Sequence, residues 1–583
     1  MRNKINHIIL IFIFVAAILP SCNFLDKQPS SEMTADDVWN SWANTTYYYN
    51  DTYNYLRNGL ARINSSWMDA ATDIAETSYS YGGTRKSFNV GNFYATEGAG
   101  EIKDTWAHYY KAIRKVNLFL ENINNVPKDA GDTQATCDAK KARMIAEMRF
   151  FRAYFFWELT LRYGAIPIID QSIDPMDDEA IFAIQRPNDI SEGVQWVLNE
   201  LQDCYFYLTA DSDVSDSDKG MITKGANLAL QARIKLYMAS PLYADLGVAN
   251  WQDAADASKI FIDNFGQGMP YALYQPVAAD ASAYQYAINR RVVGGNTEVI
   301  FWRNDASGNW WEAESPVGFG GTGGLCPSQN LVDMYDMANG ESPFDGYDET
   351  GAPIYSAAGI PNVNSDSGYS EKEPYANRDP RMYATVLYHG AMWWNRAIDV
   401  STGGSDNPTG NPYATPTGYY SKKYKDDTQT NYLDEGAVMY RNWIFIRYAE
   451  LLLNYAEAMN ELNGPSSEVF DALQQIRNRV GMTADLSSRK DLQSKESLRN
   501  FIRKERTIEL AFEDHRWWDV RRWKVAERAI ARPIYGMKVT KNDGTINYER
   551  KVAQYRVFEN RFYLYPLPEE NMWQTNWNNN TGW

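Results

Sequence analysis

Apolar residues recur every three or four positions over several long stretches of the chain, with polar residues between them. This spacing puts the apolar side chains on one face of an α-helix, which can then pack against a neighbouring helix. The fold is therefore expected to be mostly α, with antiparallel helix pairs. The pattern predicts helices over residues 34–60, 102–123, 143–164, 223–239, 251–265, 444–462, 465–480 and 496–512.

Helical periodicity fades between about residues 271 and 440, where Gly, Pro, Asn, Asp and Ser are dense. An irregular connection of this length inside a folded protein is usually functional. Its aromatic content is too high for a disordered linker, since it contains Trp302, Trp310, Trp311, Trp393 and Trp394. We predict a long, loop-rich and irregular insertion that binds the ligand, held by a helical scaffold over about 34–265 and 441–530.

Charged and aromatic residues are crowded together in residues 502–523, which have helical spacing and no helix breaker. Glu505, Glu509 and Glu513 lie four residues apart, on one stripe of the predicted helix, and Arg506 lies beside that stripe. A glycosidase needs two carboxylates facing each other across a cleft, whereas one helix presents its carboxylates in a row. Because unpaired buried charge is costly, we predict structural ion pairs at this helix, with Arg506 neutralising the glutamates.

Aromatic residues are more abundant than a hydrophobic core requires, with 19 Trp and 40 Tyr among 583 residues. Some of these rings should therefore lie at a surface where a flat ring meets a ligand. The formal net charge is −17, which argues against a nucleic-acid partner because such a partner would need a basic surface.

Residues suited to catalysis or metal binding are scarce. After the first 21 residues only His108, His389 and His515 remain, and no His-Glu-x-x-His motif occurs. Residues 318–323 match G-x-G-x-x-G, but they are not set in a βαβ unit and Pro327 follows soon after. We therefore predict no catalytic residue, no metal and no cofactor.

The cysteines do not form a disulfide framework. Cys137, Cys204 and Cys326 are far apart and odd in number, so at most one disulfide is possible. Cys326 lies near the glycine-rich segment, but no histidine accompanies it that would suggest a nucleophile.

The first 22 residues resemble the signal peptide of a bacterial lipoprotein. Arg2 and Lys4 precede an apolar run over residues 8–19, which is too short to span a bilayer comfortably. The run ends in Leu-Pro-Ser-Cys at residues 19–22, which resembles the motif cleaved before a lipidated cysteine. We predict that residues 1–21 are removed and that Cys22 carries a lipid anchor, with the polar residues after it as a tether.

Two loop segments combine aromatic rings with short polar groups, as sugar binding requires. A sugar ring has an apolar C–H face and a hydroxylated edge, so it needs a flat platform and nearby donors and acceptors. Residues 309–312 place Trp310 and Trp311 between Asn and Glu. Trp393 and Trp394 are a further aromatic pair. The other candidate loop supplies Trp67, Asp73, Tyr79, Tyr81 and Arg85.

Several motifs resemble those of one known family. The C-terminal signature comprises Glu505, Arg506, Glu509, Leu510, Phe512, Glu513, Arg516, Trp517 and Asp519. A second segment contains Arg152, Ala153, Phe155, Phe156, Leu159, Tyr163, Gly164 and Pro167. The ends of the chain add residues 22–29, 563–568 and 578–583. Over nearly its whole length the chain resembles the SusD-like (RagB/SusD) family of glycan-binding outer-membrane lipoproteins of the Bacteroidetes.

The resemblance implies one SusD-like domain over residues 22–583 with tetratricopeptide-like helix packing. It also implies a surface-exposed lipoprotein of the outer membrane that captures oligosaccharides or polysaccharides and delivers them to a SusC-like TonB-dependent transporter, without catalysis. Two other classes stay open at this point. A surface glycoside hydrolase would cleave the glycan, and a structural or fimbrial-type surface protein would bind none.

Overall fold

The computed structural model describes residues 34–583, except 61, 64–65, 80–86, 93, 95–100, 175, 277, 290–291, 293–294, 308–313 and 426–438. The predicted mostly α fold is confirmed. The long helices are α4 (Lys103–Asn122), α5 (Gln134–Tyr163), α7 (Ser191–Tyr205), α8 (Lys224–Ala239), α9 (Trp251–Phe265), α14 (Tyr448–Asn463), α15 (Ser467–Arg479) and α16 (Lys495–Glu509). No helix of the described part has both the length and the apolar character needed to cross a membrane.

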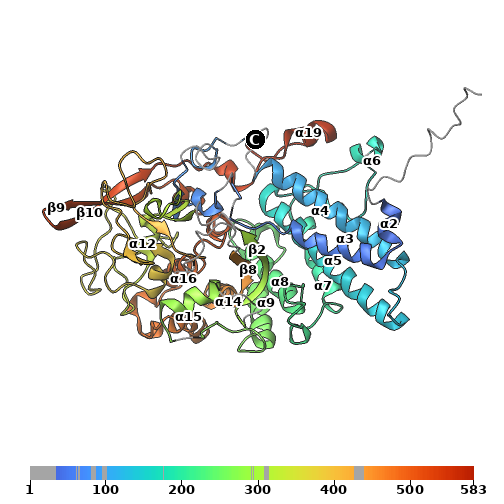
Figure 1. Ribbon diagram of the computed structural model, residues 1–583, viewed down its shortest axis with the longest axis horizontal. Coiled ribbons are helices and arrows are strands. Elements are labelled where there is room, and N and C mark those ends of the chain that lie inside the picture. The colour runs from blue at the N-terminus through green and yellow to red at the C-terminus, as the bar shows by residue number, and fades with distance from the viewer. Residues whose placement is uncertain are drawn as a thin grey trace, which may run out of the picture.

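The long helices pack in chain order, each against the next. Helix α4 packs on α5, α5 on α7, α7 on α8, and α8 on α9. The series then skips the irregular insertion, because α9 packs directly on α14, which in turn contacts α15 and α16. Figure 1 shows α3, α4, α5 and α7 together at one end of the molecule, and the insertion with α12 at the other.

Helix ends follow capping chemistry that the sequence contains. The Thr223 side chain accepts a hydrogen bond from the Ala226 N–H at the start of α8, and Asn250 forms a capping box with Asp253 at the start of α9. Gly164 ends α5 with φ 73°, a conformation that favours glycine. The shorter helices are α2 (Ala35–Trp39), α3 (Trp42–Asp51), α6 (Asp178–Phe182), α10 (Ala281–Asn289), α12 (Gln329–Met334), α13 (Pro380–Thr385), α17 (Arg516–Arg522), α18 (Ala526–Ile530) and α19 (Glu569–Thr575).

The prediction of a helix over 444–462 was partly wrong. Strand β8 (Met439–Arg447) occupies its start and pairs antiparallel with β2 (Val299–Ser307), so that α14 begins only at Tyr448. Residues 443–446 are four consecutive buried apolar residues. Such a short run fits a buried strand as well as a buried helix, and here the aromatic and β-branched side chains favour the strand.

The predicted continuous helix over 502–523 is broken. Helix α16 ends at Glu509 and α17 begins at Arg516. Between them Phe512 and Asp514 adopt left-handed backbone conformations, with φ of 63° and 64°. Glu513 therefore lies in the turn and not on the helical stripe of Glu505 and Glu509.

The remaining strands form only two-stranded sheets in the described residues. Strands β9 (Ile534–Asn542) and β10 (Thr545–Gln554) form a hairpin that the helical pattern did not predict. Its turn is Asp543-Gly544, both with positive φ, which is a typical sequence for a two-residue hairpin turn. The other pairs are β1 (Ala75–Thr77) with β3 (Leu325–Pro327), β4 (Val386–Leu387) with β7 (Tyr420–Ser421), and β5 (Met392–Trp393) with β6 (Arg396–Ala397).

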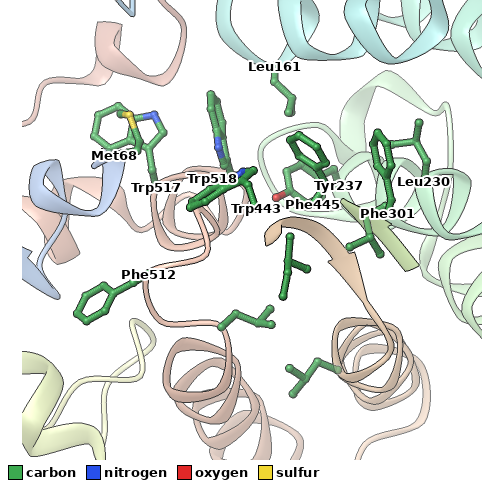
Figure 2. Packing of buried hydrophobic residues seen from close by; sticks show 14 of the residues in the cluster. Met68, Leu161, Leu230, Tyr237, Phe301, Trp443, Phe445, Phe512, Trp517 and Trp518 are labelled. Atoms are coloured by element: carbon green, nitrogen blue, oxygen red, sulfur yellow. The ribbon is translucent and has the colours of Figure 1, made fainter. Parts of the chain in front are cut away.

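One large apolar core connects the helical scaffold with the irregular insertion. Figure 2 shows Trp517 and Trp518 of α17 gathered with Trp443 and Phe445 of β8 and with Tyr237 of α8. Trp443 and Trp67 contact each other with ring centroids 5.7 Å apart, so the loop after α3 joins the same core. The core thus fixes the loops of the insertion against rigid helices.

Candidate functional site

The three glutamates of the C-terminal signature lie in a buried ion network of six acids and six bases. Arg381 and Arg477 donate to Glu505, and Arg381, Arg447 and Arg479 donate to Glu509. Glu513 accepts from Arg447 at 2.7 Å and from Lys423 at 2.6 Å. Its members are Glu298, Asp336, Asp379, Glu505, Glu509 and Glu513 with Arg381, Lys423, Arg447, Arg477, Arg479 and Lys504.

The electrostatics of this network confirm the predicted structural role. Burial alone would raise the pKa of Glu509, yet Arg479, Arg447 and Arg381 together hold it well below its usual range. A carboxyl that stays ionised at every physiological pH is a poor general acid. The predicted partner was wrong, however: Arg506 points to Asp519 at 2.8 Å and to Asn454 at 2.7 Å instead of to the glutamates.

Trp67 and Asp73, two of the four described ligand-binding candidates that are buried, correct the expectation that these residues are exposed. Trp67 is 2% exposed, and its indole N–H donates to Glu314 Oε1 at 3.1 Å. The Asp73 carboxylate is fully buried and accepts two hydrogen bonds from Arg516, at 2.8 and 2.7 Å. In this conformation neither side chain offers surface to a ligand, and both hold the loop after α3 against the C-terminal helices.

Tyr79 is buried as well, with 8% of the residue exposed, which corrects its expected exposure; it lies at the edge of the segment that these contacts anchor. Strand β1 pairs with β3, and the Ser78 hydroxyl donates to the Thr322 carbonyl at 2.7 Å. Tyr79 Oη lies 2.8 Å from Thr322 Oγ1, and its ring lies 6.3 Å from that of Tyr413. Thr322, in residues 314–324, thus contacts both Ser78 and Tyr79, and the Tyr79 ring in turn packs against the Tyr413 ring.

The glycines of residues 314–324 permit this connection. A Cβ on Gly321 would clash with the Ser315 backbone, and a Cβ on Gly324 would clash with the Glu314 carboxylate that holds Trp67. The segment forms a short 3-10 turn over Val317–Phe319 and then strand β3. The G-x-G-x-x-G match is therefore a tightly folded loop and does not precede the helix that a dinucleotide site requires.

The Trp393–Trp394 pair divides between core and surface. Trp393 is fully buried, while Trp394 is half-buried with φ 52°, and the two rings stack 5.7 Å apart. The half-buried Phe319 packs against Trp394 with its centroid 5.3 Å away. The Arg396 guanidinium lies 3.8 Å from the Phe319 centroid and donates to Asp406 at 2.6 and 2.9 Å. The burial of Trp393 corrects its expected exposure, whereas Trp394 remains accessible.

We call Tyr79, Phe319, Trp394 and Tyr413 the aromatic patch. Three stretches far apart in the sequence contribute to it, and residues 314–324 join them. Arg396 and Thr322 place polar groups beside the rings, and the fully buried Asp406 holds the Arg396 guanidinium in place. Flat faces with polar groups at their edges suit a ligand that has an apolar face and a hydroxylated rim.

The remaining candidates, Tyr81, Arg85, Trp310 and Trp311, lie outside the described residues. Tyr81 and Arg85 follow Tyr79, and Trp310 and Trp311 precede Glu314 by a few residues.

Sequence reasoning missed Phe319, Tyr413 and Arg396. The signal for Phe319 was present, because a ring between Gly318 and Gly320 has little side-chain core around it. Tyr413 and Arg396 carried no local signal, since only the tertiary fold brings them to the patch.

Other chemistry has little support in the described residues. No group of three or more His, Cys, Asp and Glu there could hold a metal ion. Cys137, Cys204 and Cys326 are free and buried, so the one possible disulfide does not form. Burial raises the pKa of the Cys326 thiol to about 12, which keeps it protonated and unreactive. A cavity of about 850 Å³ lies apart from the aromatic patch, between residues 341–366 and 488–504.

Comparison with known proteins gives consistent results. A family model described as the SusD family matches residues 283–583, and one described as "Starch-binding associating with outer membrane" matches residues 23–236. SusD-like protein P25 of Formosa agariphila is 24% identical over 548 residues, which cover 89% of this chain and 90% of that protein.

Solved structures confirm the fold. A SusD-like protein of Bacteroides fragilis superposes with a TM-score of 0.75 at 27% identity, over 96% of this chain and 100% of that one. A laminarin-binding SusD-like protein shares the fold with a TM-score of 0.55 at 20% identity, over 93% and 99% of the two chains.

Proposed function

This chain belongs to the SusD family, and on that premise we propose that it is a glycan-binding lipoprotein exposed on the outer membrane. It captures oligosaccharides or polysaccharides and delivers them to a SusC-like TonB-dependent transporter. The observation that carries the proposal is the aromatic patch, in which the half-buried rings of Phe319, Trp394 and Tyr413 lie with polar groups and the buried Tyr79.

The chemistry of the site supports binding without cleavage. Among the glutamates that first suggested an acid/base pair, Glu509 and Glu513 have pKa values lowered by basic partners in the buried ion network, and Glu505 is paired with Arg381 and Arg477. At the patch the buried Asp406 fixes the partly exposed Arg396, whose guanidinium N–H groups can donate to hydroxyl groups. No observation favours a glycoside hydrolase or a fimbrial-type protein over this proposal.

A glycan array on the purified soluble protein, followed by calorimetry with the best ligand, tests this proposal. Glucans related to laminarin are a suitable first class, because one protein of this fold is described as binding laminarin. Binding to no glycan would favour a structural protein, and release of shorter sugars on incubation would favour a hydrolase. Co-purification of a large β-barrel transporter from intact membranes would test the delivery partner.

Trp394→Ala should weaken the affinity for that glycan about three- to tenfold. The substitution removes one aromatic contact, worth about 0.5–1.5 kcal/mol beyond burial, while Trp394→Phe keeps a ring and should lose less. Trp573→Ala is the matched control, since it removes an indole that is 77% exposed on α19. Calorimetry measures the affinity. Equal losses for the two alanine variants would contradict a specific site at the aromatic patch.

Cys22→Ala should release the protein from membranes. This prediction follows from the lipoprotein motif at residues 19–22, in which the cysteine is the residue that accepts the lipid anchor. Fractionation of cells followed by immunoblotting measures the membrane-bound share, with Cys137→Ala as the control. Unchanged membrane association of Cys22→Ala would overturn the lipidation.

A further inference from the structure

A cavity of about 380 Å³ lies beside α16 and is lined by residues of α9, α14 and α16, near the cavity of about 850 Å³. Glu496 and Asn500 line both cavities, so the two meet across the first turns of the helix. The smaller cavity has the size of a small ligand site. The half-buried Trp251, the first residue of α9, offers it an aromatic ring.

The notable residue of this cavity is Arg503. Its side chain is about nine-tenths buried, with 6% of the residue exposed, and it packs 4.8 Å from the Trp523 ring. One guanidinium nitrogen donates to the Glu349 carbonyl at 2.7 Å, while Nε has no hydrogen-bond partner. Within the described part of the chain no carboxylate lies within salt-bridge distance of it, whereas the arginines of the buried ion network are all paired.

The carboxylates that line the same cavity are mostly engaged elsewhere. Glu461 accepts two hydrogen bonds from Arg499, one of them at 2.6 Å, and Glu349 pairs with Arg528. Glu496 is exposed to water in the first turn of α16. Burial lowers the pKa of Arg503 to about 10, as expected for a cation that no carboxylate contacts directly.

A buried hydrogen-bond acceptor without a partner, Asn500 Oδ1, lies on the same helix as the unpaired donor Arg503 Nε. Asn500, one turn before Arg503 on α16, donates from its amide to the Tyr347 carbonyl at 3.0 Å, but its buried Oδ1 has no hydrogen-bond partner. Buried polar groups in a folded protein are normally paired, so each such group calls for an explanation. A bound molecule with an anionic group and hydroxyl groups would satisfy both.

We propose that this cavity binds an anionic sugar residue, with the Arg503 guanidinium on its carboxylate or sulfate group. Asn500 Oδ1 accepts from a hydroxyl of the same sugar, and Trp251 contacts its ring. We take the sugar to belong to a chain, because Glu496 and Asn500 line both this cavity and the larger one beside it. The proposal rests on the proposed function only in taking the ligand to be a glycan, and its residues are separate from the aromatic patch.

Trigalacturonic acid and neutral galactotriose are the probes, compared by calorimetry at equal ionic strength. We expect the acid to bind at least about tenfold more tightly, because charge-assisted hydrogen bonds are about twice as strong as neutral ones. Arg503→Met should abolish that preference. Lys490→Met is the matched control, since it removes an exposed cation from the neighbouring cavity and should leave the preference intact. Equal losses in both variants, or no preference in the native protein, would overturn the proposal.

Inorganic sulfate gives a readout that does not depend on glycan binding. Because a ligand of the folded state raises the melting temperature, sulfate should stabilise the native protein more than Arg503→Met, relative to chloride at equal ionic strength. The variant itself should fold, since removing an unpaired buried charge costs little. Equal sulfate effects in both proteins would exclude an anion site at Arg503, whatever the glycan array shows. A normal sulfate difference with no sugar bound would leave an anion site at Arg503 and would overturn both its assignment to a sugar and the proposed function.

Discussion

Glu509→Ala should lower the free energy of unfolding by about 3–5 kcal/mol, the typical cost of removing one partner from a buried ion pair. The side chain is fully buried and accepts from Arg381, Arg447 and Arg479, which would be left with uncompensated charge. Chemical denaturation with the soluble protein measures the loss. Glu496→Ala, which removes an exposed glutamate from the same helix, is the control and should change stability by less than about 0.5 kcal/mol.

The dependence on pH provides a second measurement of the same effect. The arginines hold the pKa of Glu509 in the folded protein below its value in the unfolded chain. A lowered pKa means that the stabilisation is complete above the unfolded value near 4.5 and disappears as the pH falls through the folded value. The native protein should therefore lose stability below about pH 4.5, and Glu509→Ala should lose less. Normal stability of the variant combined with lost sugar binding would reverse the structural assignment.

A double Trp310→Ala, Trp311→Ala change should weaken glycan affinity at least about tenfold. In the sequence both tryptophans stand among small and polar residues, Ser-Gly-Asn-Trp-Trp-Glu at 307–312, a pattern that predicts little core around them. Each aromatic contact contributes about 0.5–1.5 kcal/mol beyond burial, and the loss of the buried area adds to this. Calorimetry against the identified glycan measures the change, and substitution by Phe should cost far less than by Ala.

Thermal melting of the double variant is the necessary control. If the pair is exposed, the melting temperature should hardly change, because an exposed ring contributes little to the folded state. A large loss of stability would place the pair in the core. Unchanged affinity would move the binding surface to the described aromatic patch alone, and above all to Phe319 and Trp394.

The helices were predictable where local chemistry determines them. The bounds predicted for α9 agree with the structure, because the Asn250 capping box starts the helix and the apolar period ends where it ends. The interruption between α16 and α17 was not predictable to the same degree. Phe512 and Asp514 take left-handed conformations that favour glycine, so they are held there by tertiary contacts that the sequence does not display.

The candidate site shows the same limit. The loops at 67–85, 310–324 and 393–394 were recognisable as aromatic and polar, but spacing alone cannot say which ring of a pair turns inward. Trp393 is buried and its neighbour Trp394 is not. The partners of Glu509 illustrate the point further, because Arg447 and Arg381 come from distant parts of the chain while the adjacent Arg506 points elsewhere.

The burial of the three free thiols has a practical consequence for labelling. Burial raises the pKa of Cys204 and Cys326 to about 12, and all three sulfurs lie in the interior, so maleimides at neutral pH should spare them. In a soluble form without Cys22, a single engineered cysteine would therefore take up a dye selectively. Asn395 is exposed and adjacent to Trp394, so Asn395→Cys would carry a fluorophore to the edge of the aromatic patch. Such a conjugate would report glycan capture as a change in emission, without removal of any native cysteine from the folded chain.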